Sequence, residues 1–306
     1  MYAHVVPFFR DEPYLLSYED INQPNPDFDT WNCMGQPTFL DITQPAPPYT
    51  SFNAFNAVVN CPTFYNTLYA AFKQRFNSIV RPLDPKHLIQ HDLTFYEVIT
   101  QLPVISKESD PNTVVGTQEY TAHLPLEQYW AGVVQNTAEA NNSAYIITEF
   151  GDTLDSLPDL ATSMRFFDTK QASWAYWTFV SSVLGPESGQ ILLNPDLPPS
   201  GTNINQDILN TIVEPYPRVI AGTPLSYSYN PASNVFNFAY SSLRADGNGM
   251  MSHKQLTEVF IPSSKYPSGY IVTVTGAKVV SKSNASLLLL KRNEDANIVS
   301  VVVTSR

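Results

Sequence analysis

The sequence predicts two parts of different fold class, an α/β part followed by an all-β part. Before about residue 210, short apolar runs alternate with segments whose apolar residues recur at helical spacing, which is typical of a parallel sheet with helical crossovers. After that point, runs of β-branched and aromatic residues are separated by Pro, Gly, Asn and Ser, which is typical of a small β-sandwich. We therefore expect part of a (β/α)₈ barrel over residues 1–212 and a β-sandwich over residues 213–306.

The elements of the first part follow from their apolar patterns. Five runs are predicted as buried strands, at residues 15–21, 87–93, 114–120, 144–151 and 172–180. Apolar residues at helical spacing predict helices at 63–80 and 125–140, and a weaker pattern predicts one at 157–167. In the second part, strands are expected within 225–229, 234–242, 257–262, 269–281, 285–290 and 297–305.

Composition limits the classes of function. The chain of 306 residues is 43% hydrophobic and 12% aromatic, so it can bury a sizeable core. Its net charge of -11 comes without any basic block, which argues against a nucleic-acid partner and against docking to anionic lipid. No run of about 18 apolar residues is present, so no transmembrane segment is expected.

Cysteines and glycosylation motifs indicate the secretory route. Cys33 and Cys61 lie in one loop-rich stretch. As a disulfide they would close a loop worth about 3 kcal/mol, and the alternative is two buried thiols. Asn141 and Asn284 each begin an Asn-X-Ser sequon. We expect a secreted chain, extracellular or lysosomal, although "MYAHVVPFFR" is not a signal peptide, which predicts that the true N-terminus lies upstream of Met1.

Two strand ends carry the candidate chemistry, since functional side chains of a (β/α)₈ barrel lie at the carboxyl ends of its strands. Glu149 closes an apolar strand and has two interpretations, either the nucleophile of a retaining glycosidase or a carboxylate tied to a neighbouring Arg or Tyr. A retaining mechanism needs a second carboxyl group as acid/base. By position that group would be residue 23, which is Gln.

Aromatic and metal-binding alternatives are weaker. Trp174 and Trp177 suit sugar stacking, but Trp is more often core, and strand alternation turns the two to opposite faces. The five histidines are scattered. His87 and His91 are four residues apart, but on a predicted strand they do not form a helical ligand pair. We expect no metal and no cofactor.

Several of these segments together resemble glycoside hydrolase family 5, and in particular its endoglycoceramidase branch. "FRDEPYLLSYEDINQP" (9–24) is similar to the segment that ends strand 4 with Asn-Glu-Pro. "YIITEFG" (145–151) resembles the nucleophile motif of strand 7, and "ASWAYWTF" (172–179) resembles strand 8. The most specific likeness is "VEPYPRVIAGTPLSYSYNPASNVFNFAYSS" (213–242), which resembles the linker and the first strands of the C-terminal sandwich.

The resemblance implies a retaining hydrolase that cleaves the bond between glycan and ceramide in glycosphingolipids without a metal. It places the nucleophile at Glu149, the acid/base at Gln23 and the ligand of the sugar 2-hydroxyl at Asn22. Its His-x-Tyr pattern on strand 6 falls on Gln118 and Tyr120, with Gln in place of His.

Three departures from the family bear on activity. Gln23 replaces the proton donor, Gln118 replaces the family's His, and only 22 residues precede residue 23 where three βα units are expected. We therefore expect impaired or lost catalysis. The alternatives are a non-catalytic glycan-binding or structural secreted protein, a fully active hydrolase, and an engineered Glu-to-Gln variant. Either upstream residues or a second polypeptide would supply barrel strands 1–3.

Overall fold

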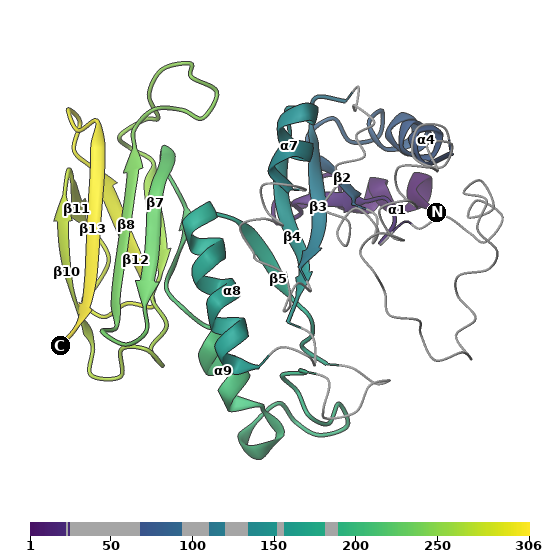
Figure 1. Cartoon of the computed structure of the whole chain (residues 1–306). Coiled ribbons are helices and arrows are strands. Elements are labelled where there is room, and N and C mark those ends of the chain that lie inside the picture. Colours follow the sequence, from purple (N-terminus) through teal and green to yellow (C-terminus); the bar gives the residue numbers. More distant parts are fainter. Residues whose placement is uncertain (23, 25–67, 94–109, 120–133, 152–155, 181–188) are drawn as a thin grey trace. The chain divides into compact units, whose positions relative to one another are not determined.

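The computed structural model describes residues 1–22, 24, 68–93, 110–119, 134–151, 156–180 and 189–306. Packing divides the chain into two compact units, and each is described by itself (Figure 1). The first unit comprises Met1–Phe150 and Ser173–Tyr176, and the second comprises Gly151–Ala172 and Trp177–Arg306. This division places the helix at Leu157–Lys170, which follows a strand of the parallel sheet in the chain, in the same unit as the sandwich. The domain boundary between residues 212 and 213 stays a prediction.

The first unit is built on a five-stranded parallel sheet in the order β1-β2-β3-β4-β5. All five predicted strands are present, although β5 ends at Tyr176 rather than at residue 180. The helices of this unit include α1, which the sequence did not predict. The bounds are α1 Tyr2–Phe9, β1 Ser17–Glu19, α4 Ala70–Val80, β2 Leu88–Asp92, β3 Thr113–Glu119, α7 Asn136–Asn141, β4 Ala144–Phe150 and β5 Ser173–Tyr176.

Helices α1 and α4 cover one face of β1 and β2. Val6 of α1 and Phe76 of α4 pack with Tyr18 and Ile89 from the two strands, and all four are less than 10% exposed. Because alternate residues of a strand point to opposite faces, this packing leaves Glu19 and Gln90 on the other face. The parallel strands and their helices form part of a (β/α)₈ barrel, as the sequence predicts.

The second unit begins with helix α8 (Leu157–Lys170), which is longer than the predicted 157–167. Ser156 caps it, since its Oγ accepts from the Asp159 amide and the Asp159 carboxylate accepts from the Ser156 amide. This reciprocal capping box, with Pro158 in the first turn, fixes the start of the helix. A one-turn 3₁₀ helix η4 (Gly201–Asn203) and helix α9 (Gln206–Ile212) follow.

Two four-stranded antiparallel sheets complete the second unit and form the predicted β-sandwich (Figure 1). One sheet has the order β10-β13-β8-β7, and the other has the order β11-β12-β9-β6. The bounds are β6 Tyr216–Val219, β7 Thr223–Asn230, β8 Val235–Ser241, β9 Leu256–Phe260, β10 Tyr270–Thr275, β11 Ala277–Val279, β12 Leu287–Arg292 and β13 Ile298–Ser305.

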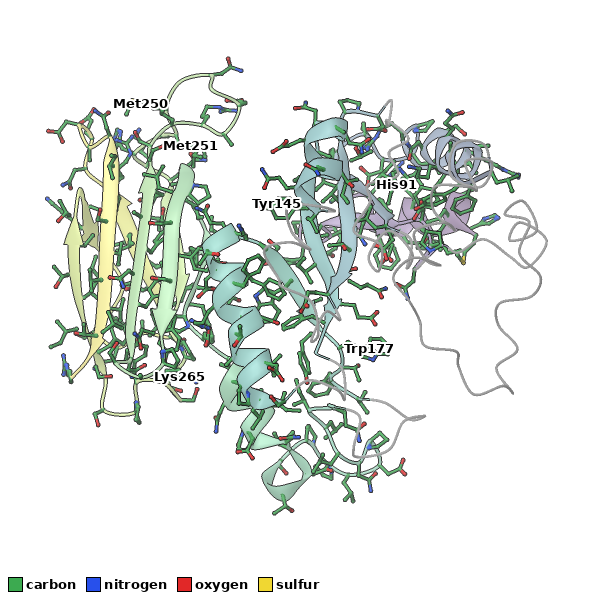
Figure 2. All side chains as sticks on the ribbon, viewed as in Figure 1. His91, Tyr145, Trp177, Met250, Met251 and Lys265 are labelled. Atoms are coloured by element: carbon green, nitrogen blue, oxygen red, sulfur yellow. The ribbon has the colours of Figure 1, made fainter. Side chains whose placement is uncertain are left out.

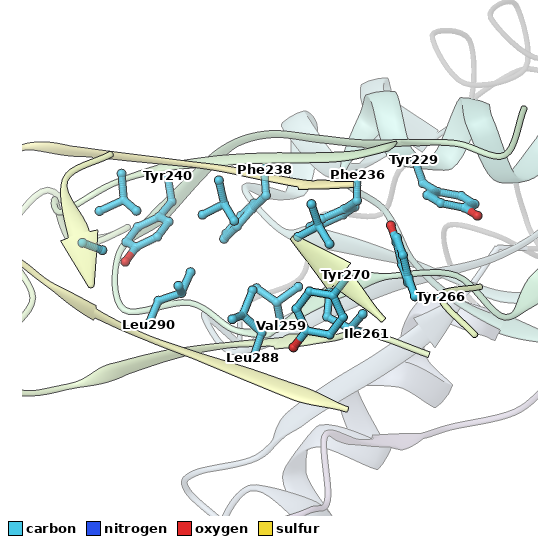
Figure 3. Packing of buried hydrophobic residues seen from close by; sticks show 14 residues of the cluster. Tyr229, Phe236, Phe238, Tyr240, Val259, Ile261, Tyr266, Tyr270, Leu288 and Leu290 are labelled. Atoms are coloured by element: carbon cyan, nitrogen blue, oxygen red, sulfur yellow. The ribbon is translucent and has the colours of Figure 1, made fainter. Parts of the chain in front are cut away.

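The sandwich core forms because side chains along its strands point alternately inward and outward. Phe236, Phe238 and Tyr240 of β8 point inward in a row and face Leu288 and Leu290 of the other sheet (Figure 3). Each of these five side chains is at most 2% exposed. Burial of large aromatic groups at this density dominates the stability of a small sandwich. In the described part of the chain, no helix combines the length and the apolarity that crossing a bilayer requires.

Candidate functional site

The inner face of the parallel sheet is polar. Gln90 and Asp92 of β2 and Gln118 of β3 are each at most 4% exposed, and they lie on the face opposite the helix-packed Ile89. The Gln90 side chain accepts a hydrogen bond from Ser17 (3.2 Å) and donates one to Asp92 (3.4 Å). Buried polar groups in such numbers, near the carboxyl ends of parallel strands, mark the place where a (β/α)₈ barrel holds its site.

A shift in strand register brings Glu149 to this face. Thr117 of β3 pairs with Ile147 of β4, but the next residue, Gln118, pairs with Glu149. Without this register shift at Thr148, regular alternation would place Glu149 on the same face as the buried Ile147. A β-bulge commonly re-aims a side chain next to an active site, and here it places Glu149 in register with Gln118, on the same face of the sheet.

Asn22 joins the same group. The Gln118 side-chain amide donates a hydrogen bond to Asn22 Oδ1 at 2.7 Å. This contact joins the segment after β1 to β3, across 96 residues of sequence. The structure thus brings together three of the predicted site residues, namely Asn22, Gln118 and Glu149.

Electrostatics connect Glu19 to this group. Burial raises the pKa of Glu19, and the charges of Asp20 and Glu149 act in the same direction, while hydrogen bonds with Asp92 and Gln90 oppose them. The charge of Glu149 thus reaches the half-buried Glu19 carboxyl group. A shifted pKa beside a second carboxylate is often found at a functional site.

Gly116 leaves room for this cluster. A Cβ atom at residue 116 would lie 2.0 Å from Asp92 Oδ1 and 2.9 Å from Gln90 Nε2. Because any other side chain would collide with the carboxylate, the glycine lets Asp92 fold across the inner face of β3.

The two tryptophans are placed differently. Trp174 pairs with Ile147 and contacts Phe150 edge-on at a ring distance of 5.2 Å. It therefore lies on the face opposite Glu149, and this placement does not support its predicted role in sugar stacking. Trp177 follows β5, is 44% exposed and belongs to the second unit (Figure 2), so its role at the site stays a prediction.

Four predicted positions, Gln23, Tyr120, Cys33 and Cys61, lie outside the described residues. The two sequon asparagines are described. Asn141 ends α7 and donates to the Thr137 carbonyl, and Asn284 accepts from the Tyr270 amide. Within the described ranges, no group of three or more His, Cys, Asp or Glu side chains is arranged to hold a metal ion.

Sequence reasoning missed Glu19, Asp92 and the pair His91–Asp20. The sequence predicts a buried strand over 87–93, and the polar residues Gln90 and Asp92, two positions apart in that strand, were the available signal that one of its faces is a site. The pairing of His91 with Asp20 gave no such signal, because it joins residues 71 positions apart.

Comparison with known proteins identifies relatives. Residues 215–303 match the family model of the glycoside hydrolase family 5 C-terminal domain. Endoglycoceramidase I of Rhodococcus hoagii (strain 103S) is 22% identical over 280 residues, which cover 83% of this chain and 51% of that protein.

Two solved structures of endo-glycoceramidase II from Rhodococcus sp. share the fold over the whole chain. The lactosyl-enzyme intermediate is 21% identical with a TM-score of 0.69, and the ganglioside GM3 complex is 21% identical with a TM-score of 0.67. In both cases all of this chain aligns with 62% of the other. The chain thus spans about half the length of its curated relative. Residues 215–303 thus match the glycoside hydrolase family 5 C-terminal domain, and the chain shares the fold of endo-glycoceramidase II.

Proposed function

We propose that the chain is an endoglycoceramidase-like protein that holds the glycan of a glycosphingolipid against Glu149 but cleaves it poorly or not at all. The observation that carries this proposal is the convergence of Asn22, Gln118 and Glu149 on the inner face of the sheet. Asn22 would bind a sugar hydroxyl, and Glu149 would be the nucleophile of a retaining mechanism.

Impaired catalysis follows from the chemistry of Gln23. Retaining hydrolysis needs an acid that protonates the departing oxygen and then, as a base, activates water. A carboxamide hydrogen-bonds to that oxygen but carries no proton that it can release at neutral pH. The loss of general-acid help typically slows such a reaction by about 10²–10⁴-fold.

A glycolipid is the ligand class that the relatives favour. A related endo-glycoceramidase II was solved as a complex with ganglioside GM3 and as a lactosyl-enzyme intermediate. We infer the same class of ligand for this chain, namely a lactose-containing headgroup on ceramide. The ligand would be held by hydrogen bonds to the polar side chains of the inner face of the parallel sheet.

A second candidate is a glycan-binding protein with no catalytic role. Gln118 favours it, because the resemblance predicts His at that position and the substitution adds to the one at Gln23. In this case Glu149 would serve as a hydrogen-bond acceptor for a sugar hydroxyl.

An activated substrate separates the two candidates. A 2,4-dinitrophenyl lactoside needs no protonation of its leaving group, so an intact Glu149 nucleophile would form a glycosyl-enzyme that accumulates, since no base activates water. Intact-protein mass spectrometry would detect one added lactosyl group in the natural chain, mapped to Glu149, and none in Glu149→Gln. If the natural chain gains no such group but still binds GM3 micelles, it is a binding protein.

The secretory location is part of this proposal. Cys33, Cys61 and the sequons at Asn141 and Asn284 support a secreted or lysosomal protein. Barrel strands beyond the five seen here would come from upstream residues or from a second polypeptide. Expression with a leader in a eukaryotic host, followed by glycosidase digestion and thiol titration of the denatured chain, would test the two modifications.

A further inference from the structure

A buried hydrogen-bonded chain runs from helix α4 to the end of β1. The His91 ring is 2.6 Å from Asp20 Oδ2 through Nδ1 and 3.1 Å from Asn77 Oδ1 through Nε2. All three residues are less than 10% exposed. The His91 ring (Figure 2) contacts Phe76 of α4 edge-on, so it lies on the helix-covered face of the sheet.

Asp20 links the His91 ring to the backbone just before Asn22. Its other oxygen, Oδ1, accepts a hydrogen bond from the Ile21 amide at 2.7 Å. The next residue is Asn22, which accepts from Gln118, and residue 23 follows in sequence. Asp20 thus holds the backbone at Ile21, and Gln118 holds the side chain of Asn22.

We propose that Asn77, His91 and Asp20 form a positioning network that fixes the orientation of Ile21 and Asn22 for glycan binding. Neither His91 nor Asp20 touches the ligand in this scheme, so both are positioning residues. The predicted effect of this network on glycan binding rests on the proposed function. Its predicted effect on the backbone at Ile21 does not depend on that function.

A merely structural role for His91 is the competing explanation, and the chain contains a matched control. His87 forms the same kind of pair, with its Nδ1 2.6 Å from Asp84 Oδ2, at the opposite end of β2. Asp84 holds Tyr18 and the amides of Lys86 and His87 rather than the end of β1. His87→Phe therefore removes a comparable hydrogen bond without touching Ile21.

The first measurement needs no ligand. Amide hydrogen exchange at Ile21, followed by NMR in the unliganded full chain, is expected to become about tenfold faster in His91→Phe. It should stay unchanged in His87→Phe and be partly restored in His91→Gln, which keeps one N–H donor. Equal exchange rates at Ile21 in the two Phe variants would overturn the proposal. If His91→Phe does not fold, Asn77→Leu removes only the outer partner of the ring and takes its place under the same criterion.

The second measurement uses GM3 micelles as the probe. His91→Phe is expected to bind GM3 about three- to tenfold more weakly, and its effect should not add to that of Asn22→Ala, because both act through one residue. Full additivity would overturn the positioning role. If the natural chain binds no GM3, the proposed function is wrong, and the exchange rate at Ile21 alone decides whether the network fixes the end of β1.

Discussion

The side-chain amide of Gln118 donates a 2.7 Å hydrogen bond to Asn22 Oδ1, which joins the third strand of the half-barrel to the end of the first. Gln118 also pairs in register with Glu149. One buried glutamine therefore contacts the residue predicted to hold a sugar hydroxyl and neighbours the residue predicted to attack the sugar.

Removal of this hydrogen bond should weaken glycan binding. Gln118→Leu keeps the approximate volume but leaves Asn22 without its donor, which costs about 1 kcal/mol or roughly a fivefold loss of GM3 affinity. Isothermal titration with GM3 micelles measures this. Gln190→Leu is the control, since Gln190 is equally buried but donates to the Leu193 carbonyl in the second unit. Equal affinity losses in the two variants would remove Gln118 from the site.

Gly116 should be intolerant of even a methyl group. The Cβ of Gly116→Ala would collide with Asp92 Oδ1, and overpacking of this kind costs about 1–3 kcal/mol of unfolding free energy. Chemical denaturation measures the loss. Asp92→Ala removes the colliding carboxylate, so the double variant should be more stable than the sum of the single effects predicts. Simple additivity would mean that the crowding at Gly116 comes from elsewhere.

Stability should fall with rising pH because of a buried acid between α8 and the sandwich. Burial raises the pKa of Asp168 to about 7; the charge of Arg165 lowers it and the charge of Glu214 raises it again. The folded chain thus keeps a proton that the unfolded chain loses near the ordinary value of 3.8. Between about pH 4 and pH 7 the unfolding free energy should decrease, by at most about 1.4 kcal/mol per pH unit for this one proton.

Substitution at Asp168 isolates this contribution. Burial also raises the pKa values of Glu19 and Glu214, so these two groups lower the unfolding free energy with rising pH as Asp168 does. The test is therefore how much the substitution changes the slope of unfolding free energy against pH. Denaturation curves from pH 4 to pH 8 should show a smaller pH dependence in Asp168→Asn than in the natural chain. The exposed Asp246→Asn serves as the control. An unchanged slope in Asp168→Asn would contradict the raised pKa.

The sandwich core should be sensitive to truncation. Phe238 is 2% exposed and its ring stacks on Tyr240 at 5.4 Å, so Phe238→Ala should cost about 3–5 kcal/mol of unfolding free energy. Phe8 is 83% exposed, and Phe8→Ala should change stability by less than about 0.5 kcal/mol. Thermal denaturation distinguishes the two, and similar losses would argue against the packing described here.

The positions of the strands were predictable where burial requires a run of apolar residues or a regular alternation of apolar and polar residues. The runs that became β2, β3 and β4 are enclosed in the sheet and read as buried strands, and the sandwich strands alternate as their two-sided packing requires. The motif around Glu149 and the Asn22-Gln23-Pro24 tripeptide predict a site, and in the structure Gln118 bonds to Asn22 and pairs in register with Glu149; the catalytic roles of these residues stay a prediction.

Features that depend on long-range contacts were not predictable. The bulge that turns Glu149 inward depends on the register between two strands, which a single sequence does not display. Trp174 packs on Phe150 because the bulge leaves Phe150 on the helix-covered face. Strand β6 lies in a segment that the family resemblance predicts to be a linker, and helix α9, which the sequence does not predict, is only seven residues long.

The central claim is that an amide occupies the acid/base position while the nucleophile is kept, and Gln23→Glu tests it most directly. Turnover of a fluorescent GM3 analogue should be measured in the natural chain, in Gln23→Glu and in Gln23→Glu/Glu149→Gln, each supplied with any further barrel strands that the native protein has. We predict that Gln23→Glu raises the rate by about 10²–10⁴-fold and that the added Glu149→Gln abolishes the gain. Rapid turnover by the natural chain, at a rate that Gln23→Glu does not increase, would contradict the account.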